Sequence, residues 1–267
     1  MKKKIGFIVI LGIILSVIGL AITAVSAVYA YQDYKNYSKF NEGVLELKEQ
    51  QDYSFNLDSG NITILKSDKE YTYIDYKIVD FYEIKNDNKN INITSKYKFM
   101  FPFFRNKNVV NIYLANTDTS NISFTLNAGS IEIKGTHQFN TLDLELNAGL
   151  IMVEEIIANK VNVKVNAGDF NMKDGEVDNL DLKVNAGSLN IKSLFTNLNF
   201  TVNAGCLDVT AYNTKDEYTI NIDKNAGSSN VKNGGSGTRT IKGEVNAGSV
   251  NFQFTGANKE VLSTKIS

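Results

Sequence analysis

The sequence predicts an all-β protein: a single-stranded parallel β-helix (β-solenoid) of about 18–22 residues per coil, preceded by one N-terminal transmembrane helix. Three observations support this fold class. They are an apolar N-terminal segment, a tripeptide that occurs seven times, and strand-like alternation around every copy. A fixed period with one-sided apolar columns is typical of a solenoid, because one coil cannot bury its apolar face until its neighbours stack on it.

The N-terminal segment, residues 5–30, is almost entirely apolar and follows three lysines at positions 2–4. As a helix these residues would span about 39 Å, more than the ~30 Å hydrocarbon core of a bilayer. This length favours a retained anchor over a cleaved signal peptide, whose apolar core has about 7–15 residues, although the small residues up to Ala27 and Ala30 would also suit cleavage. The positive-inside rule keeps the lysines in the cytoplasm and places the rest of the chain outside the cell.

An Asn-Ala-Gly tripeptide marks the corner of each predicted coil. Asparagine and glycine tolerate positive φ, and asparagine can hydrogen-bond its local backbone, so we interpret the tripeptide as a structural turn rather than a displayed ligand-binding motif. Stacked copies are expected to form a ladder of side-chain amides, and the small alanine suits a crowded bend. The predicted turn residues are Asn127, Gly129, Asn147, Gly149, Asn166, Gly168, Asn185, Gly187, Asn203, Gly205, Asn225, Gly227, Asn246 and Gly248.

Apolar and polar residues alternate with a period of two on both sides of the tripeptide, as in a half-buried strand. In the copy at Asn127, we expect Phe124, Leu126, Ile131 and Ile133 to point into the core. Antiparallel hairpins are the alternative arrangement. They are less favoured because the apolar columns match from coil to coil in the same direction, as parallel stacking requires.

Three residues interrupt columns that are otherwise apolar: Lys224, Ser229 and Gly243. They lie near a glycine-rich segment at residues 233–237, which we expect to be flexible. The interruptions predict a widened, loosely packed coil near the C-terminal end of the rod, and a binding cleft at these residues is the less favoured alternative.

A degenerate copy of the repeat lies upstream, where Asp58-Ser59-Gly60 replaces the tripeptide within "YSFNLDSGNITI". The chain up to Ser120 then contains longer strands, which we expect to cap the rod because an open β edge invites aggregation. The expected organisation is a cytoplasmic N-terminus at 1–4, a transmembrane anchor at 5–30, a juxtamembrane linker at 31–50, a β capping region with one degenerate repeat at 51–120, β-solenoid repeats at 121–255 and a C-terminal tail at 256–267.

This arrangement resembles the bacterial membrane-anchored β-strand-repeat proteins called "putative adhesins" or toast-rack domains, which include LiaG-like proteins. The resemblance covers Phe55–Ile64, the stretch "NIYLANTDTSNISFTLNAGSIEIKG" and the repeats beyond. The regular Asn-Ala-Gly departs from the Ser-Gly-Asp turn that is more usual in that family. The resemblance implies an extracytoplasmic β-solenoid without a defined catalytic site, linked in some members to cell-envelope stress systems.

The composition leaves few candidates for catalysis or metal binding. His137 is the only histidine and Cys206 the only cysteine, so an intrachain disulfide, a thiolate zinc site and an iron–sulfur cluster are excluded. We expect His137 to lie in a solvated loop. The outward carboxylates are scattered, as on a solvated face, so we expect no enzyme, no cofactor and no metal site, and a carbohydrate-active β-helix enzyme is the least favoured function. These carboxylates include Glu132, Glu145, Asp208, Asp223 and Glu244.

The function that we expect is a surface binding or scaffold module, adhesin-like, held in the cell membrane by a single pass with its C-terminal domain outside. The alternative is an accessory or sensor of an envelope stress response that acts through a membrane partner. Expected partners are the membrane, an envelope membrane protein or a cell-surface polymer. The formal charge of −1 gives no indication of nucleic acid.

An aromatic stretch, "YKFMFPFFRNK", interrupts the capping region. We favour a hydrophobic plug over the end of the rod. The alternative is an exposed loop that touches the membrane or a partner through Phe101, Phe103, Phe104 and Arg105.

Overall fold

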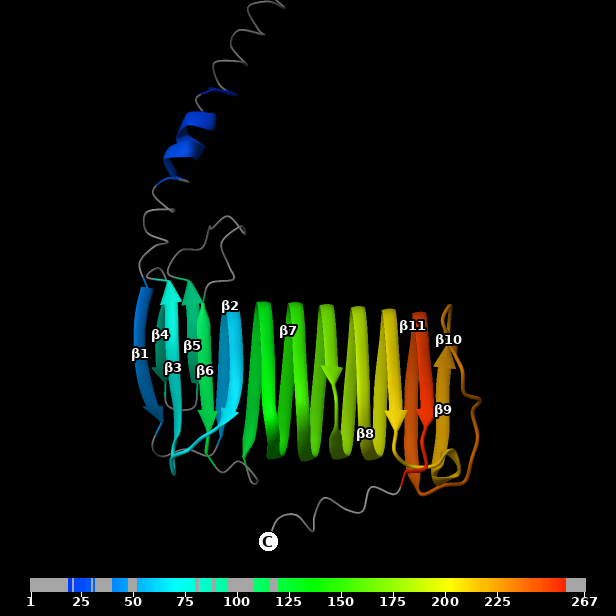
Figure 1. The fold of residues 1–267 in the computed structure, drawn as a ribbon. Coiled ribbons are helices and arrows are strands. Elements are labelled where there is room, and N and C mark those ends of the chain that lie inside the picture. The colour runs from blue at the N-terminus through cyan, green and yellow to red at the C-terminus, as the bar shows by residue number, and fades with distance from the viewer. Residues whose placement is uncertain are drawn as a thin grey trace, which may run out of the picture.

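A computed structural model of the chain describes residues 19–20, 22–29, 31, 40–47, 52–79, 82–87, 90–95, 108–115 and 120–257. It shows a rod of β-strands and a separate helical segment (Figure 1). The aromatic stretch with Phe101, Phe103, Phe104 and Arg105, and most of the predicted C-terminal tail, lie outside the described residues.

The helical segment comprises residues 19–20, 22–29 and 31. Its apolar side chains, among them Leu20, Val25 and Val28, are exposed. Within the described part of the chain, no helix combines the length and the apolar character needed to cross a membrane.

The rod is one continuous all-β, solenoid-like structure. Its strands, with one short 3-10 turn at Lys215–Glu217, are β1 Phe40–Leu47, β2 Tyr53–Lys66, β3 Thr72–Val79, β4 Tyr82–Asp87, β5 Asn90–Ser95, β6 Val109–Leu114, β7 Asn121–Met172, β8 Gly175–Ala211, β9 Tyr218–Lys224, β10 Ser228–Ser229 and β11 Arg239–Phe254. The described strands pair in the order β1-β3-β6-β2-β7-β8-β11-β10, with β5 on β2, β4 on β5 and β9 on β11. Both β7 and β8 turn corners without a break, so each contains more than one coil (Figure 1).

Neighbouring coils stack in parallel and in register, which excludes the hairpin alternative. Val165 pairs with Val184, and Gly168 pairs with Gly187. The apolar columns therefore become continuous walls of the core, and Val184 has no exposed surface. Burying an aliphatic or aromatic side chain contributes roughly 1.5–3 kcal/mol, so the stacked columns are the main source of stability.

The N-terminal end changes from coils to separate strands. β5 pairs in parallel with the first half of β2, and β6 pairs in parallel with the second half. Antiparallel strands then follow, with β4 on β5, β3 on β6 and β1 on β3. β1 lies within residues 31–50, where sequence analysis places a linker, so the sheet begins at Phe40 rather than near residue 51.

At the C-terminal end the coils do not stack in chain order. β11 lies between β8 and the pair β9 and β10, although it follows both along the chain (Figure 1). Ile241 pairs with Leu198 on one side and with Ile220 on the other. The coil formed by β9 and β10 is therefore the end of the rod, and β11 is an inserted coil.

Side-chain shape explains the insertion and corrects the expectation of a loosely packed coil. A Cβ atom at residue 243 would lie closer than 3.0 Å to the ring of Phe200, so Gly243 leaves the space that this ring fills. Lys224 and Ser229 belong to the end coil, where Lys224 is exposed. The three interruptions mark an inserted coil and an end coil rather than a widened one.

The glycine-rich segment covers the outer edge of the end coil. Ile220 and Gly234 exchange two backbone hydrogen bonds, at 2.8 and 2.9 Å. The Asn233 side chain accepts from the N–H of Ile222 at 2.8 Å and donates to its carbonyl at 3.1 Å, as a neighbouring strand would. These bonds satisfy backbone N–H and C=O groups at the edge of β9, which could otherwise pair with a strand of another chain.

The inserted position of β11 predicts where a new disulfide can form. Ser249 pairs directly with Cys206, and its Oγ lies 3.4 Å from the Cys206 Sγ. Adjacent strands lie about 4.8 Å apart, within the range that a disulfide bridges, so Ser249→Cys is expected to oxidise readily with Cys206. Ser228 is one coil further away, beyond Ser249, so Ser228→Cys is expected to keep both thiols free. Thiol titration of the two monomeric variants distinguishes them. A disulfide in the Ser228→Cys variant but not in the Ser249→Cys variant would contradict the position of β11 between β8 and β10.

Candidate functional site

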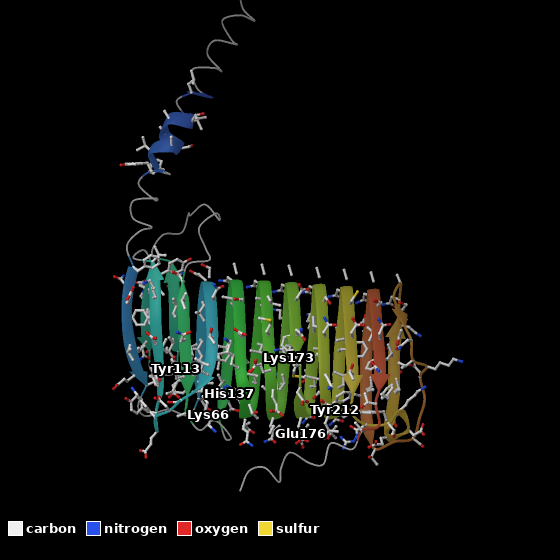
Figure 2. The ribbon with its side chains drawn as sticks, viewed as in Figure 1. Lys66, Tyr113, His137, Lys173, Glu176 and Tyr212 are labelled. Carbon is white, nitrogen blue, oxygen red and sulfur yellow. The ribbon has the colours of Figure 1, made fainter. Side chains whose placement is uncertain are left out.

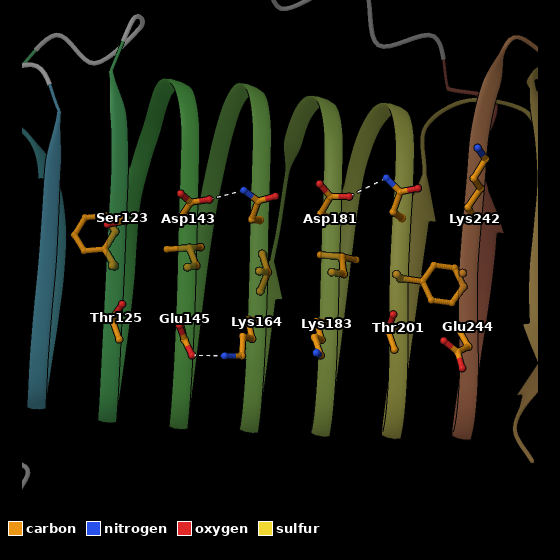
Figure 3. A pocket seen from close by; sticks show the side chains of 18 residues that line it. Ser123, Thr125, Asp143, Glu145, Lys164, Asp181, Lys183, Thr201, Lys242 and Glu244 are labelled. Carbon is orange, nitrogen blue, oxygen red and sulfur yellow. Dashed lines mark hydrogen bonds and ion pairs between the residues drawn. The ribbon is translucent and has the colours of Figure 1, made fainter.

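A groove of about 690 Å³ runs along one face of the rod (Figure 3). Its walls come from the strands that precede each tripeptide, and it crosses six coils. In a strand, alternate residues project from the same face, so each coil contributes two outward side chains about 6.8 Å apart, with one inward residue between them.

Two rows of polar side chains flank the groove. The first, which we call the Asp/Asn row, contains Ser123, Asp143, Asn162, Asp181, Asn199 and Lys242. The second, which we call the Lys/Thr row, contains Thr125, Glu145, Lys164, Lys183, Thr201 and Glu244. The inward residues between the rows, from Phe124 to Phe200, are at most 4% exposed. The groove therefore offers polar groups along both margins, although carbon atoms make up most of its exposed lining.

Coil-to-coil contacts fix several of these side chains (Figure 3). The Asn162 amide donates to Asp143, and the Asn199 amide donates to Asp181 at 2.8 Å. Lys164 forms an ion pair with Glu145 at 2.5 Å. Each contact joins one coil to the next, so the rows are ordered along the rod axis.

The remaining charges of the groove are a carboxylate and two amines. The Glu244 carboxylate lies 3.4 Å from the Asn225 amide. Lys183 and Lys242 are exposed, and neither has an ion-pair partner among the described residues. The groove thus contains four carboxylates and three amines, a net charge of −1.

The predicted turn residues lie along a different edge of the rod, where they form an amide ladder. Each asparagine side chain donates to the corresponding side chain of a neighbouring coil, and the order follows space rather than sequence. The donor–acceptor pairs are Asn127–Asp58 (3.1 Å), Asn147–Asn127 (2.6 Å), Asn166–Asn147 (2.5 Å), Asn185–Asn166 (2.6 Å), Asn203–Asn185 (2.7 Å), Asn246–Asn203 (2.9 Å) and Asn225–Asn246 (2.5 Å).

The glycine of the corner, not the alanine, occupies the crowded position. Gly187 has φ +136°, and a Cβ there would lie closer than 3.0 Å to the carbonyl oxygen of Gly168. Ala186 is exposed, which corrects the expectation that alanine fits a tight bend. Gly227, in the end coil, is the predicted turn glycine without a positive φ.

A second amide ladder, missed in the sequence, follows the opposite end of the strands. Asn140 donates to Asn121 at 2.9 Å, Asn159 to Asn140 at 3.0 Å and Asn197 to Asn179 at 3.0 Å. These asparagines precede the tripeptide by six or seven residues. The signal was present, but the variable links between coils hid it.

His137 does not lie in a solvated loop. It is a strand residue, 4% exposed, in the body of the rod (Figure 2). Its ring stacks on Phe139, and its Nε2 lies 3.0 Å from the carbonyl oxygen of Lys134. Burial lowers the pKa of His137, so the imidazole is held neutral and away from solvent. The period of two, which places His137 and Phe139 on the inner face, could have revealed this.

The single cysteine, Cys206, lies in a different environment from His137. It is exposed, follows the corner glycine Gly205, and lies next to Ser249. Among the described residues, no group of three or more His, Cys, Asp or Glu side chains is arranged to hold a metal ion.

The family model described as Toastrack DUF4097 matches residues 48–266, which include the strands from β2 to β11. The chain belongs to the Toastrack family. This confirms the resemblance to toast-rack, adhesin-like proteins that the turns and strands suggested. No curated protein matches this Toastrack chain.

Solved structures similar to this Toastrack chain share little sequence with it. A "putative adhesin" from Bacteroides fragilis is 17% identical, with a TM-score of 0.48, and the match covers 81% of this chain and 98% of that one. A "putative adhesin" from Parabacteroides merdae is 12% identical, with a TM-score of 0.47 and coverages of 80% and 96%. A "putative cell adhesion protein" from Clostridium sporogenes is 18% identical, with a TM-score of 0.28 and coverages of 81% and 100%.

Proposed function

We propose that this Toastrack protein is a membrane-anchored binding module that holds an extended polymer along its rod outside the cell. The observation that carries the proposal is the groove, which crosses six coils and presents an outward pair of side chains from each. Coils about 4.8 Å apart give contacts over roughly 24 Å, a length that suits a chain-like ligand better than a compact one.

Binding along the groove requires little rearrangement of the protein. The contacts Asn162–Asp143, Asn199–Asp181 and Lys164–Glu145 already hold side chains in place before a ligand arrives. Ordering a flexible side chain on binding costs about 0.5–1.5 kcal/mol, so a pre-ordered row keeps more of its interaction energy. Many modest contacts in series then add up to useful affinity.

The proposal assigns binding without catalysis. The carboxylates of the groove already contact amides or an amine of neighbouring coils, and the single histidine is buried elsewhere. Acid–base catalysis needs a pair of groups placed to exchange protons with a substrate, whereas the proposal assigns these carboxylates, each in contact with a neighbouring coil, to hydrogen bonding of a ligand. The anchor at residues 5–30 and the preceding lysines support placement in the cell membrane with the rod outside.

Photo-crosslinking in intact cells tests the binding face. A photoreactive residue at Thr201 lies in the groove, and the same residue at Thr210 lies in the same coil beyond the corner, outside the groove. We expect a high-molecular-weight polymer adduct from Thr201 and little from Thr210. Equal adducts at both positions, or none at either, would refute the proposal.

The same cells test the topology. Cys206 is exposed and is the only cysteine, so a membrane-impermeant maleimide is expected to label it without permeabilisation. Labelling only after the membrane is opened would place the rod in the cytoplasm and exclude a surface role.

A further inference from the structure

We infer that the groove binds an uncharged polysaccharide, an inference that rests on the proposed binding function and specifies its ligand. The charges of the groove disfavour both polyanions and polycations, and its floor disfavours extended peptides. The hydrogen-bonding groups favour the class that remains.

The charges of the groove disfavour a strongly charged polymer of either sign. The groove contains four carboxylates and three amines, so a polyanion that contacts Lys183 and Lys242 also meets the carboxylates of the Asp/Asn row. A polycation meets the amines, and it would have to displace the neighbours that already contact the carboxylates. Mixed and internally satisfied charges suit a ligand without charge.

The sheet also disfavours an extended peptide. A peptide strand adds to a sheet through open backbone groups at an edge. The floor of the groove is the middle of the sheet, where Val163 is paired with Leu182 in the parallel ladder. Apolar peptide side chains find no pocket either, because the inward residues are at most 4% exposed. Neither backbone pairing nor apolar anchoring is open to a peptide here.

A hydroxyl-rich chain matches the groups that remain. A hydroxyl both donates and accepts, and the rows offer carboxylate and amide oxygens as acceptors with amide, ammonium and Ser or Thr hydroxyl groups as donors. Hydrogen bonds to charged groups are stronger than neutral ones, even when the ligand itself is uncharged. The Asn199–Asp181 contact keeps a donor and an acceptor side by side in the groove. Similar groups recur from coil to coil, as the sugar units of a polysaccharide do.

The structure supplies a matched pair of variants to test this inference. Asn199 donates to Asp181 in the groove at 2.8 Å, and Asn251 donates to Asp208 at 2.9 Å in the strands beyond the corner, outside the groove. Asn199→Ala and Asn251→Ala remove the same kind of coil-to-coil contact, so they are expected to change the urea midpoint equally. Only Asn199→Ala changes the groove.

The experiment uses the full chain in lipid nanodiscs and measures co-sedimentation with cellulose, chitin and starch, and binding to heparin, polyphosphate and polylysine. We expect saturable binding to at least one neutral polysaccharide, with the same affinity at low and high salt. Asn199→Ala is expected to weaken it about fivefold, the effect of losing one hydrogen bond between the neutral amide and a sugar hydroxyl. Asn251→Ala is expected to leave it unchanged.

Each other outcome overturns a definite part of the argument. Salt-sensitive binding of a polyanion or polycation, without neutral binding, overturns the polysaccharide inference but leaves a polymer-binding groove. Equal effects of Asn199→Ala and Asn251→Ala on binding show that the polysaccharide binds elsewhere. If none of the probes binds, the polysaccharide inference fails. If in addition the Thr201 position forms no adduct in cells, the proposed function itself fails.

Discussion

Val184→Asp is expected to unfold the rod. Val184 has no exposed surface and stacks on Val165 of the preceding coil, so the new carboxylate would be buried in an apolar column without a partner. An unpaired buried charge costs several kcal/mol, against a total stability of about 5–15 kcal/mol for a typical domain. We expect the free energy of unfolding to fall by more than about 4 kcal/mol, measured by urea titration with far-ultraviolet circular dichroism.

Lys183→Asp provides the control for that substitution at the neighbouring position. Lys183 is exposed and has no ion-pair partner among the described residues. A surface change of this kind shifts the free energy of unfolding by no more than about 0.5 kcal/mol. Comparable losses at residues 183 and 184 would show that inward and outward positions are assigned incorrectly.

Gly187→Ala is expected to be nearly as damaging, for a different reason. The residue has φ +136°, which strains any side chain, and its added Cβ would overlap the backbone carbonyl of Gly168. The overlap is with backbone, so it cannot be relieved by rotating a side chain, and the two coils would have to separate. We expect a loss of at least about 3 kcal/mol by the same titration, because over-packing and backbone strain each cost about 1–3 kcal/mol.

Gly135→Ala separates the two causes. Gly135 also has a positive φ, +77°, but a Cβ there would meet no atom within 4 Å. Its substitution is expected to show the backbone term alone, about 1–2 kcal/mol. If Gly187→Ala were no worse than Gly135→Ala, close stacking of the corner glycines would not be a source of stability.

The features that sequence could predict are those set by local spacing. The period of two around Val184 fixes which side chains point inward, and the near-constant distance between copies fixes which residues become neighbours. A tripeptide of Asn, Ala and Gly has few structural uses other than a turn. The parallel register follows because only in-register stacking brings similar apolar residues together, as it does for Val165 and Val184.

The order of the last two coils could not be predicted in the same way. The coils share the same columns, so a coil centred on Asn246 fits beside Asn203 or beyond Asn225 without changing the local pattern. The deciding contact is the ring of Phe200 in the space left by Gly243, between residues distant in sequence. In the sequence alone, Gly243 is only an interruption of an otherwise apolar column.

The groove could not be predicted from the sequence for a related reason. Its side chains follow the pattern of a solvated face, because polar residues alternate with apolar ones along each strand. Their order arises from contacts such as Asn199–Asp181, which join residues 18 positions apart. A surface built from such contacts becomes visible only when neighbouring coils are placed side by side.

The inserted coil has a consequence for the timing of biogenesis. β11 follows β9 and β10 along the chain, so it is synthesised after them, yet both of these strands pair with it. The end coil therefore cannot pair with its neighbour until residues 239–254 have been synthesised. Closure of the rod becomes a late event in synthesis, and a chain cut short before β11 carries an unfinished end that proteases can recognise.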